Sequence, residues 1–206
     1  MIRCDRDGRL WRATIDRPDK ANSLTPDMLH ELADFAESAQ GAASVLVLTG
    51  AGKVFSAGAD LDAAKAGLAT DPVWERLSGA VARFDGLSIA ALNGTLAGGA
   101  FGMALACDLR VAVQGAKFFY PVMKLGFLPQ PSDPPRLVSL VGPARARLIL
   151  MGAARLTADE ALSFGLADRL VAPEDLTAAV AELAEAALGA HPAHIAGIKA
   201  LTRARL

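Results

Sequence analysis

Residues 86–107 form an uncharged stretch that is long enough to cross a lipid bilayer. The stretch also contains Asn93-Gly94, which is a strong turn signal, and the pair Gly98-Gly99. A buried strand, a turn and a buried helix account for this pattern better than a membrane span does. We therefore expect a globular chain with this segment in its core, and no partnership with a membrane.

Strands and helices alternate along the rest of the chain. Residues 45–48 are apolar without a break, as expected of a strand that is covered on both faces. Thr25 followed by Pro26 marks a helix start, and Thr157 with Glu160 forms a capping box before a helix that Gly165 ends. Further strands are expected at residues 10–15, 89–92 and 109–113, and further helices at about 73–84, 99–107, 173–188 and 192–206.

This alternation predicts an α/β fold in a single domain that spans residues 1–206, with a core to about residue 170 and C-terminal helices over about 171–206. Hydrophobic residues make up 52% of the chain, which excludes an intrinsically disordered protein. The formal net charge of −1 gives no sign of a nucleic-acid partner. The two distant cysteines supply no metal site, and the lack of an apolar leader makes a cytoplasmic location the default expectation.

Two glycine-centred segments, residues 55–61 (FSAGADL) and 93–99 (NGTLAGG), place bare backbone N–H groups at two turns. The first N–H groups of a helix lack intrahelical partners, and Gly99 would let a ligand approach them without a β-carbon in the way. If the turn at Ala57-Gly58-Ala59 supplies a second donor, the two donors can hold the oxygen of an activated carbonyl. The alternative is that these glycines only permit tight packing of a helix on a sheet.

Several segments, taken in order, carry a resemblance to a known family. They are residues 17–23 (RPDKANS), 55–61, 89–94 (IAALNG), 97–99 (AGG), 105–110 (LACDLR), 125–129 (LGFLP), 157–161 (TADEA) and 165–167 (GLA). In this order, and over nearly the whole chain, the sequence resembles the crotonase (enoyl-CoA hydratase/isomerase) superfamily. The resemblance implies a ClpP/crotonase-like fold of repeated ββα units with C-terminal helices.

The resemblance also implies a site for a CoA thioester. By position, Ala59 and Gly99 would be the two oxyanion donors to the thioester carbonyl. Ala57 would meet the adenine, and Lys20 and Ala21 would lie along the CoA. The wider CoA and substrate region would take in Asp60, Leu61 and Asp62, although Asp60 is also expected to cap the helix that follows.

Members of this superfamily need no metal and no permanently bound cofactor, because CoA enters as part of the substrate. The resemblance therefore implies an acyl-CoA substrate and a homotrimer or hexamer. The C-terminal helices are expected to be shorter than in the family, which leaves that assembly open.

The sequence departs from the hydratases of the family at both acid/base positions. Those enzymes place one glutamate three residues after the second oxyanion glycine, and here that residue is Gly102. A second glutamate normally follows the proline of a later loop, and here Val122 follows Pro121. Hydration needs a carboxylate to activate water and an acid to protonate the α-carbon. These departures argue against standard hydration.

Other groups near these positions could transfer a proton. Some relatives use an aspartate at the position that Gln130 occupies here, and an amide cannot act as a base at neutral pH. Asp133 follows in a proline-rich run and could serve as the acid/base group if the loop turns inward; the alternative is that it caps a helix before Pro134-Pro135. Tyr120 could donate a proton to an enolate, or it could serve only in packing.

The sequence thus predicts an enoyl-CoA hydratase/isomerase-like protein that binds an acyl-CoA thioester and stabilises its enolate through backbone N–H groups. Three alternatives stay open. One is an acyl-CoA decarboxylase-type enzyme, in which leaving CO₂ takes the place of the proton that a base would remove. The second is a non-catalytic acyl-CoA binding protein, and the third is a structural or assembly subunit that binds no CoA.

Overall fold

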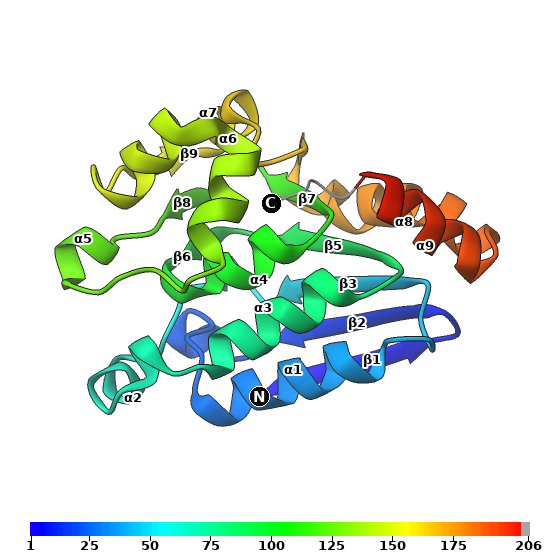
Figure 1. Cartoon of the computed structure of the whole chain (residues 1–206), viewed down its shortest axis with the longest axis horizontal. Coiled ribbons are helices and arrows are strands. Elements are labelled where there is room, and N and C mark those ends of the chain that lie inside the picture. Colours follow the sequence, from blue (N-terminus) through cyan, green and yellow to red (C-terminus); the bar gives the residue numbers. More distant parts are fainter. Residues whose placement is uncertain (203–206) are drawn as a thin grey trace.

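The computed structural model describes residues 1–202, and its centre is a six-stranded sheet (Figure 1). The strand order is β1-β2-β3-β5-β7-β10. Their bounds are β1 Ile2–Asp7, β2 Leu10–Ile15, β3 Val45–Gly50, β5 Leu87–Leu92, β7 Leu109–Val113 and β10 Arg169–Val171. The β1–β2 pair is antiparallel and all the other pairs are parallel. Residues 45–48 of β3 and 89–92 of β5 are apolar and buried, as expected of strands in a sheet that is covered on both faces.

A second sheet lies beside the first and contains only short strands. Its order is β4-β6-β8-β9, with bounds β4 Val54–Ser56, β6 Thr95–Ala97, β8 Lys117–Phe119 and β9 Leu156–Thr157. Each of the long strands β3, β5 and β7 is followed by one of these short strands and then by a helix. This is the repeated ββα arrangement, so the predicted α/β class and crotonase-like fold are confirmed.

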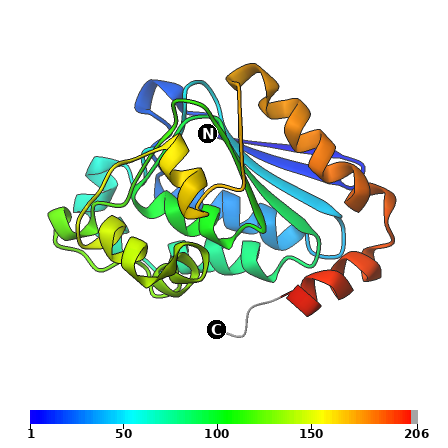
Figure 2. The same ribbon diagram turned by 90° about the horizontal axis from the view of Figure 1, so that it is seen from above.

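Helices cover both faces of the large sheet (Figure 2). One face packs under α1 (Pro26–Ser38), α3 (Val73–Arg83) and α4 (Phe101–Ala106), whereas α8 (Leu176–Gly189) lies on the other face. The remaining helices are α2 Leu61–Lys65, α5 Val122–Leu125, α6 Asp133–Leu150, α7 Ala158–Phe164 and α9 Pro192–Thr202. Short 3-10 helices lie at Pro18–Lys20, Leu68–Thr70, Gly98–Ala100 and Pro173–Asp175.

The expected helix ends are confirmed. The Thr25 hydroxyl accepts a hydrogen bond from the Met28 N–H at 3.4 Å, with Pro26 in the first turn of α1. Both bonds of the Thr157–Glu160 capping box are present, and Gly165 ends α7 in the left-handed conformation. The last expected helix is present as α9 to Thr202, and residues 203–206 lie outside the described part of the chain.

The uncharged segment 86–107 folds as predicted. It forms β5, then β6, the 3-10 helix Gly98–Ala100 and α4, and every residue of α4 is buried. Within residues 1–202, no helix has the length and the apolar character that a bilayer crossing requires. The segment therefore builds the core and carries the second glycine turn to the end of β6.

Candidate active site

The first glycine turn, at Ala57-Gly58-Ala59, is held by backbone bonds to the segment after β2. The Leu24 N–H donates to the Gly58 carbonyl, and the Asp60 N–H donates to the Leu24 carbonyl, each at 2.8 Å. These two bonds form a parallel β-bridge between Leu24 and Ala59. They use the backbone groups on either side of Ala59, so the Ala59 N–H itself faces away from Leu24. Within residues 1–202 that N–H has no hydrogen-bond acceptor.

The second turn, at Gly98-Gly99, touches the first. Gly99 is the second residue of the 3-10 helix that precedes α4, where an N–H has no intrahelical acceptor. A methyl group on Gly58 would lie 2.9 Å from the Ala97 carbonyl oxygen and 3.3 Å from the Gly99 nitrogen. The fold thus brings Ala59 and Gly99 together across a contact that admits no side chain on Gly58.

Both turns open on one cavity of about 340 Å³. Its wall is mainly apolar, and the polar side chains in it are Lys65, Tyr120 and Gln130. The other lining residues include Ala57, Ala59, Leu61, Trp74, Gly98, Gly99, Phe119, Val122, Leu125, Phe127 and Leu128. An apolar wall with a few convergent polar groups is typical of a small-molecule site.

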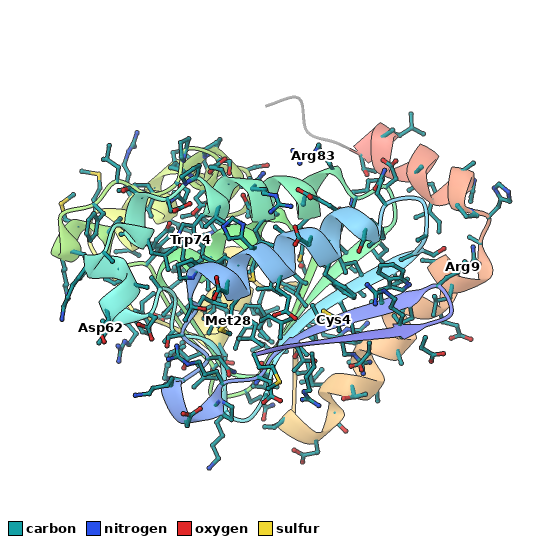
Figure 3. All side chains as sticks on the ribbon, turned by 90° about the horizontal axis from the view of Figure 1, so that it is seen from below. Cys4, Arg9, Met28, Asp62, Trp74 and Arg83 are labelled. Carbon is teal, nitrogen blue, oxygen red and sulfur yellow. The ribbon has the colours of Figure 1, made fainter. Side chains whose placement is uncertain are left out.

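Trp74 closes the cavity over the second turn. A methyl group on Gly99 would lie 3.1 Å from the indole ring, and the indole N–H donates to the Leu68 carbonyl at 2.8 Å. Trp74 is buried, whereas Figure 3 shows Asp62 at the end of the molecule. The role of Trp74 was not predicted, because its spacing along α3 marks only a buried helix face.

The expected CoA segment follows the first turn. Ala21 accepts a backbone hydrogen bond from Ala57 at 3.0 Å, which ties the two stretches together. Ala57 and Leu61 line the cavity, whereas Lys20, Ala21, Asp60 and Asp62 are not among its lining residues. The Ala57–Ala21 bond thus joins the segment with Lys20 and Ala21 to a residue of the cavity wall.

Asp60 is a helix cap, as expected. Its carboxylate accepts hydrogen bonds from the N–H groups of Asp62 and Ala63, and it forms an ion pair with Arg17 at 2.8 Å. The Arg17 hydrogen bond holds the pKa of the Asp60 carboxyl below its usual value. Asp62 is exposed and pairs with Lys65 at 3.6 Å. Asp60 therefore shapes the first turn, and nothing in its contacts assigns it to a substrate.

Asp133 occupies the space over Gly102, the position at which the resemblance predicts a glutamate. A methyl group on Gly102 would lie 2.9 Å from the Asp133 Oδ1 atom. The Asp133 side chain is fully buried, and its Oδ2 atom accepts a hydrogen bond from the Tyr120 hydroxyl at 2.8 Å. Its Oδ1 atom has no partner among the described residues.

The alternative interpretation of Asp133 as a helix cap is wrong. The N-cap of α6 is Ser132, and Asp133 is the first helical residue, with its carboxylate turned toward α4. The local signal favoured a cap, but α6 packs against α4 and Gly102 leaves room there for a side chain. Burial raises the pKa of Asp133 to about 6, against the opposing effects of the Tyr120 bond and the Arg136 charge.

Tyr120 connects Asp133 with the cavity. Its ring stacks on Phe101 with centroids 5.3 Å apart, and the residue also lines the cavity. Burial, and then the Asp133 charge, raise the pKa of its hydroxyl. Packing alone therefore does not describe Tyr120. Gln130 lines the same wall, and its side-chain amide donates to the Ala69 carbonyl at 3.2 Å.

Replacing Asp133 with asparagine is expected to stabilise the fold at neutral pH. A carboxyl pKa raised from 3.8 to about 6 means that the folded state binds more protons between these values, so wild-type stability falls as pH rises through this window. Above about pH 6 the buried carboxylate lowers the free energy of unfolding by about 3 kcal/mol, and the uncharged amide of asparagine avoids this loss. Urea unfolding at pH 8 and pH 4 measures the difference, which should shrink toward zero at the lower pH. Parallel pH curves for the two proteins would refute the buried charge.

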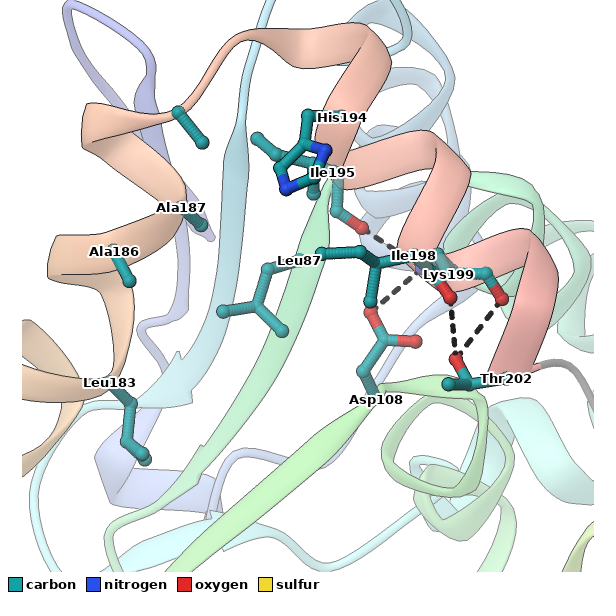
Figure 4. Close-up of a pocket in the computed structure, with 12 residues that line it drawn as sticks. Leu87, Asp108, Leu183, Ala186, Ala187, His194, Ile195, Ile198, Lys199 and Thr202 are labelled. Atoms are coloured by element: carbon teal, nitrogen blue, oxygen red, sulfur yellow. Dashed lines mark hydrogen bonds and ion pairs between the residues drawn. The ribbon is translucent and has the colours of Figure 1, made fainter.

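A second cavity, of about 460 Å³, lies between α8 and α9 (Figure 4). Apolar side chains such as Leu183, Ile195 and Ile198 line it. The cavity wall also contains Lys199, whose ammonium group is already paired. The Lys199 Nζ atom lies 2.7 Å from Asp108 Oδ2 and 3.0 Å from the Gly86 carbonyl oxygen. This cavity shares no lining residue with the other one, and both glycine turns lie at the other one. The turns therefore mark the stronger candidate site.

Comparison with known proteins agrees with this geometry. A family model described as enoyl-CoA hydratase/isomerase matches residues 6–206. Carnitinyl-CoA dehydratase from Salmonella arizonae is 35% identical over 209 residues, which covers 98% of this chain and 80% of that protein.

Solved structures give the same result. Enoyl-CoA hydratase from Bacillus anthracis superposes with a TM-score of 0.89 at 29% identity, covering 97% of this chain and 81% of that one. DspI from Pseudomonas aeruginosa superposes with a TM-score of 0.88 at 32% identity, covering 97% and 85%. The ordered motifs, the ββα repeats and these matches together establish that the chain belongs to the enoyl-CoA hydratase/isomerase family.

Proposed function

We propose that the protein binds an acyl-CoA thioester in the cavity at the glycine turns and stabilises its enolate. In this proposal the N–H groups of Ala59 and Gly99 donate to the thioester oxygen. The observation that carries it is that the Ala59 N–H has no acceptor in residues 1–202, while Gly99 lies across the contact at Gly58 and lines the same cavity as Ala59. Each donor of such a pair is typically worth about 3–4 kcal/mol in the transition state.

The substrate class follows from the family and from the surroundings of the cavity. The Salmonella arizonae relative is named for a CoA thioester, and acyl-CoA is the substrate class of the family. We assign the CoA to the segment with Lys20 and Ala21, which is bonded to Ala57 at the cavity. The apolar wall on the other side, with Phe119, Leu125 and others, suits an acyl chain.

The reaction we propose is enolate formation without hydration. Hydration needs two positioned acid/base groups. Gly102 and Val122 stand where the family hydratases place them, and neither side chain can transfer a proton. An oxyanion hole alone still favours any step that develops negative charge on the thioester oxygen.

Titration calorimetry with CoA and with acetoacetyl-CoA tests the proposal. We expect acetoacetyl-CoA to bind at least about tenfold tighter than CoA, because only the thioester has an oxygen for the two N–H groups. An enolate absorption band should appear on binding. Equal affinities without such a band would refute the oxyanion hole. A turnover panel of enoyl-, malonyl- and β-ketoacyl-CoA then distinguishes a decarboxylase, an enzyme of another reaction type and a protein that only binds the thioester. Brisk hydration of crotonyl-CoA would contradict the proposed reaction, which excludes hydration.

We also propose that the protein works as a homotrimer or a hexamer. Helix α9 has no buried residue, and it exposes Ile198 and Leu201 at 52% and 88%. A second copy of the chain is one partner that could cover this apolar surface. Sedimentation equilibrium measures the assembly directly, and a monomer at micromolar concentration would contradict it.

A further inference from the structure

We infer that Tyr120 and Asp133 form the proton-transfer pair of this site. Tyr120 exchanges a proton with the α-carbon of the bound thioester, and Asp133 holds that proton behind the phenol. This inference rests on the proposed function, since it needs a thioester in the cavity. It replaces the two glutamates of the hydratases with a single relay from a different part of the chain.

The relay follows from the positions of the two side chains. Tyr120 lines the cavity together with Ala59 and Gly99, and its hydroxyl donates to Asp133 Oδ2 at 2.8 Å. Asp133 is fully buried and does not line the cavity. Asp133 therefore reaches a ligand only through the phenol, which makes Tyr120 the catalytic residue and Asp133 a positioning residue.

In the part of the chain that the structure describes, only one oxygen of the buried Asp133 carboxylate has a hydrogen-bond partner, whereas a buried carboxylate with a purely structural role normally has partners for both. Its Oδ1 atom has no partner within residues 1–202, although buried polar atoms are normally hydrogen-bonded. A buried unpaired oxygen beside a ligand cavity is costly and marks a candidate functional group. Gly102 makes the arrangement possible, because any β-carbon there would lie 2.9 Å from that oxygen. The residue that removes the hydratase glutamate thus creates the room for Asp133.

The charged groups around Asp133 oppose one another. Arg136 on α6 lowers the pKa of Asp133, and Glu75 on α3 raises it. Both contact Ser132, whose hydroxyl donates to Glu75 Oε1 at 2.8 Å and accepts from Arg136 Nη1 at 2.8 Å. Because these two charges act in opposite directions on the Asp133 pKa, desolvation by burial has the largest effect on it. The resulting pKa of about 6 suits a base that works near neutral pH.

The proposed step is balanced. The α-C–H bond breaks, and its proton moves to the Tyr120 oxygen while the Tyr120 hydroxyl proton moves to Asp133 Oδ2. The C–H electron pair becomes the enolate C=C bond, and the carbonyl π pair moves to the oxygen that faces Ala59 and Gly99. In D₂O the proton held by the pair exchanges for a deuteron from the solvent. Return of that deuteron to the α-carbon by the same route leaves a deuterium-labelled thioester. The substrate class is an acyl-CoA with at least one α-hydrogen.

Deuterium incorporation at the α-carbon of butyryl-CoA in D₂O tests the relay by mass spectrometry. We expect the wild-type protein to catalyse exchange, with a rate that rises through about pH 6 and then levels off, because the base form of the pair is required. Tyr120→Phe keeps the ring stack on Phe101 but removes the hydroxyl, and should lower the rate at least about 100-fold. Asp133→Asn should lower it comparably and abolish the inflection.

Controls separate the relay from folding and from binding. Ser78→Ala removes a buried hydroxyl that contacts Ser132 rather than the pair, so its exchange rate should stay within about threefold of wild type. Calorimetry with acetoacetyl-CoA should give near wild-type affinity for Tyr120→Phe. A wild-type protein that binds acetoacetyl-CoA but exchanges nothing overturns the relay, as does wild-type exchange by Tyr120→Phe or an inflection retained in Asp133→Asn. A protein that binds no thioester overturns the proposed function itself.

Discussion

An Arg110→Met variant is expected to lose about 3–4 kcal/mol of folding free energy. Arg110 lies on β7 and its side chain is 3% exposed. Its guanidinium donates to the Leu166 carbonyl at 3.0 Å, to the Cys107 carbonyl at 2.8 Å and to Asp168 Oδ2 at 2.8 Å. These bonds join the end of α4 to the loop that leads into β10.

Methionine would fill most of the volume but supply no donor. Two buried carbonyl oxygens would lose a charged partner, and each such loss costs about 1–3 kcal/mol. The Asp168 carboxylate is 37% exposed and keeps the Arg110 N–H at 2.7 Å, so water and that bond reduce its share of the cost.

Urea unfolding gives the difference in free energy from the shift of the midpoint. Arg3→Met is the matched control, because it breaks the Arg3–Asp16 ion pair in which Arg3 is 55% exposed. An exposed pair of this kind is worth under about 1 kcal/mol. Similar losses for Arg3→Met and Arg110→Met would refute the argument that the buried bonds of Arg110 hold this corner together.

The sequence predicted the parts of the fold that depend on local signals. Strands β3 and β5 contain apolar runs at residues 45–48 and 89–92, and the caps at Thr25 and Thr157 are short motifs with fixed spacing. The second sheet was not predicted, since its strands have two or three residues each and show no period. Strand β1 was missed because it is an edge strand whose residues after Ile2 are mostly polar and exposed.

The site was predictable only as far as it is local. The glycines of both turns are visible in the sequence, and their contact follows from the ββα repeat. The position of Asp133 is not local, since it depends on α6 packing against α4 at Gly102. An aspartate before two prolines favours a cap, and a missing glutamate at Gly102 indicates only a loss. A small residue at position 102 and a carboxylate at position 133 are complementary in volume. That complementarity is the one sequence signal that could have predicted their contact.

Gly58→Ala is expected to abolish tight thioester binding. Gly58 has φ +91°, and a methyl group there would lie 2.9 Å from the Ala97 carbonyl oxygen and 3.2 Å from Gly98 Cα. These neighbours are backbone atoms, so the variant can relieve the clash only by moving the two turns apart. In the proposed oxyanion hole the N–H groups of Ala59 and Gly99 converge across this contact, so moving the turns apart would separate the two donors.

The Gly115→Ala variant separates this effect from simple backbone strain. Gly115 has φ +82° in the turn between β7 and β8, and nothing lies within 4 Å of an added methyl group. Both variants pay about 1–2 kcal/mol for a left-handed alanine. Calorimetry with acetoacetyl-CoA should therefore show wild-type affinity for Gly115→Ala and at least a tenfold loss for Gly58→Ala. If Gly58→Ala folds and binds the thioester as tightly as wild type, then the contact between the turns does not build the oxyanion hole.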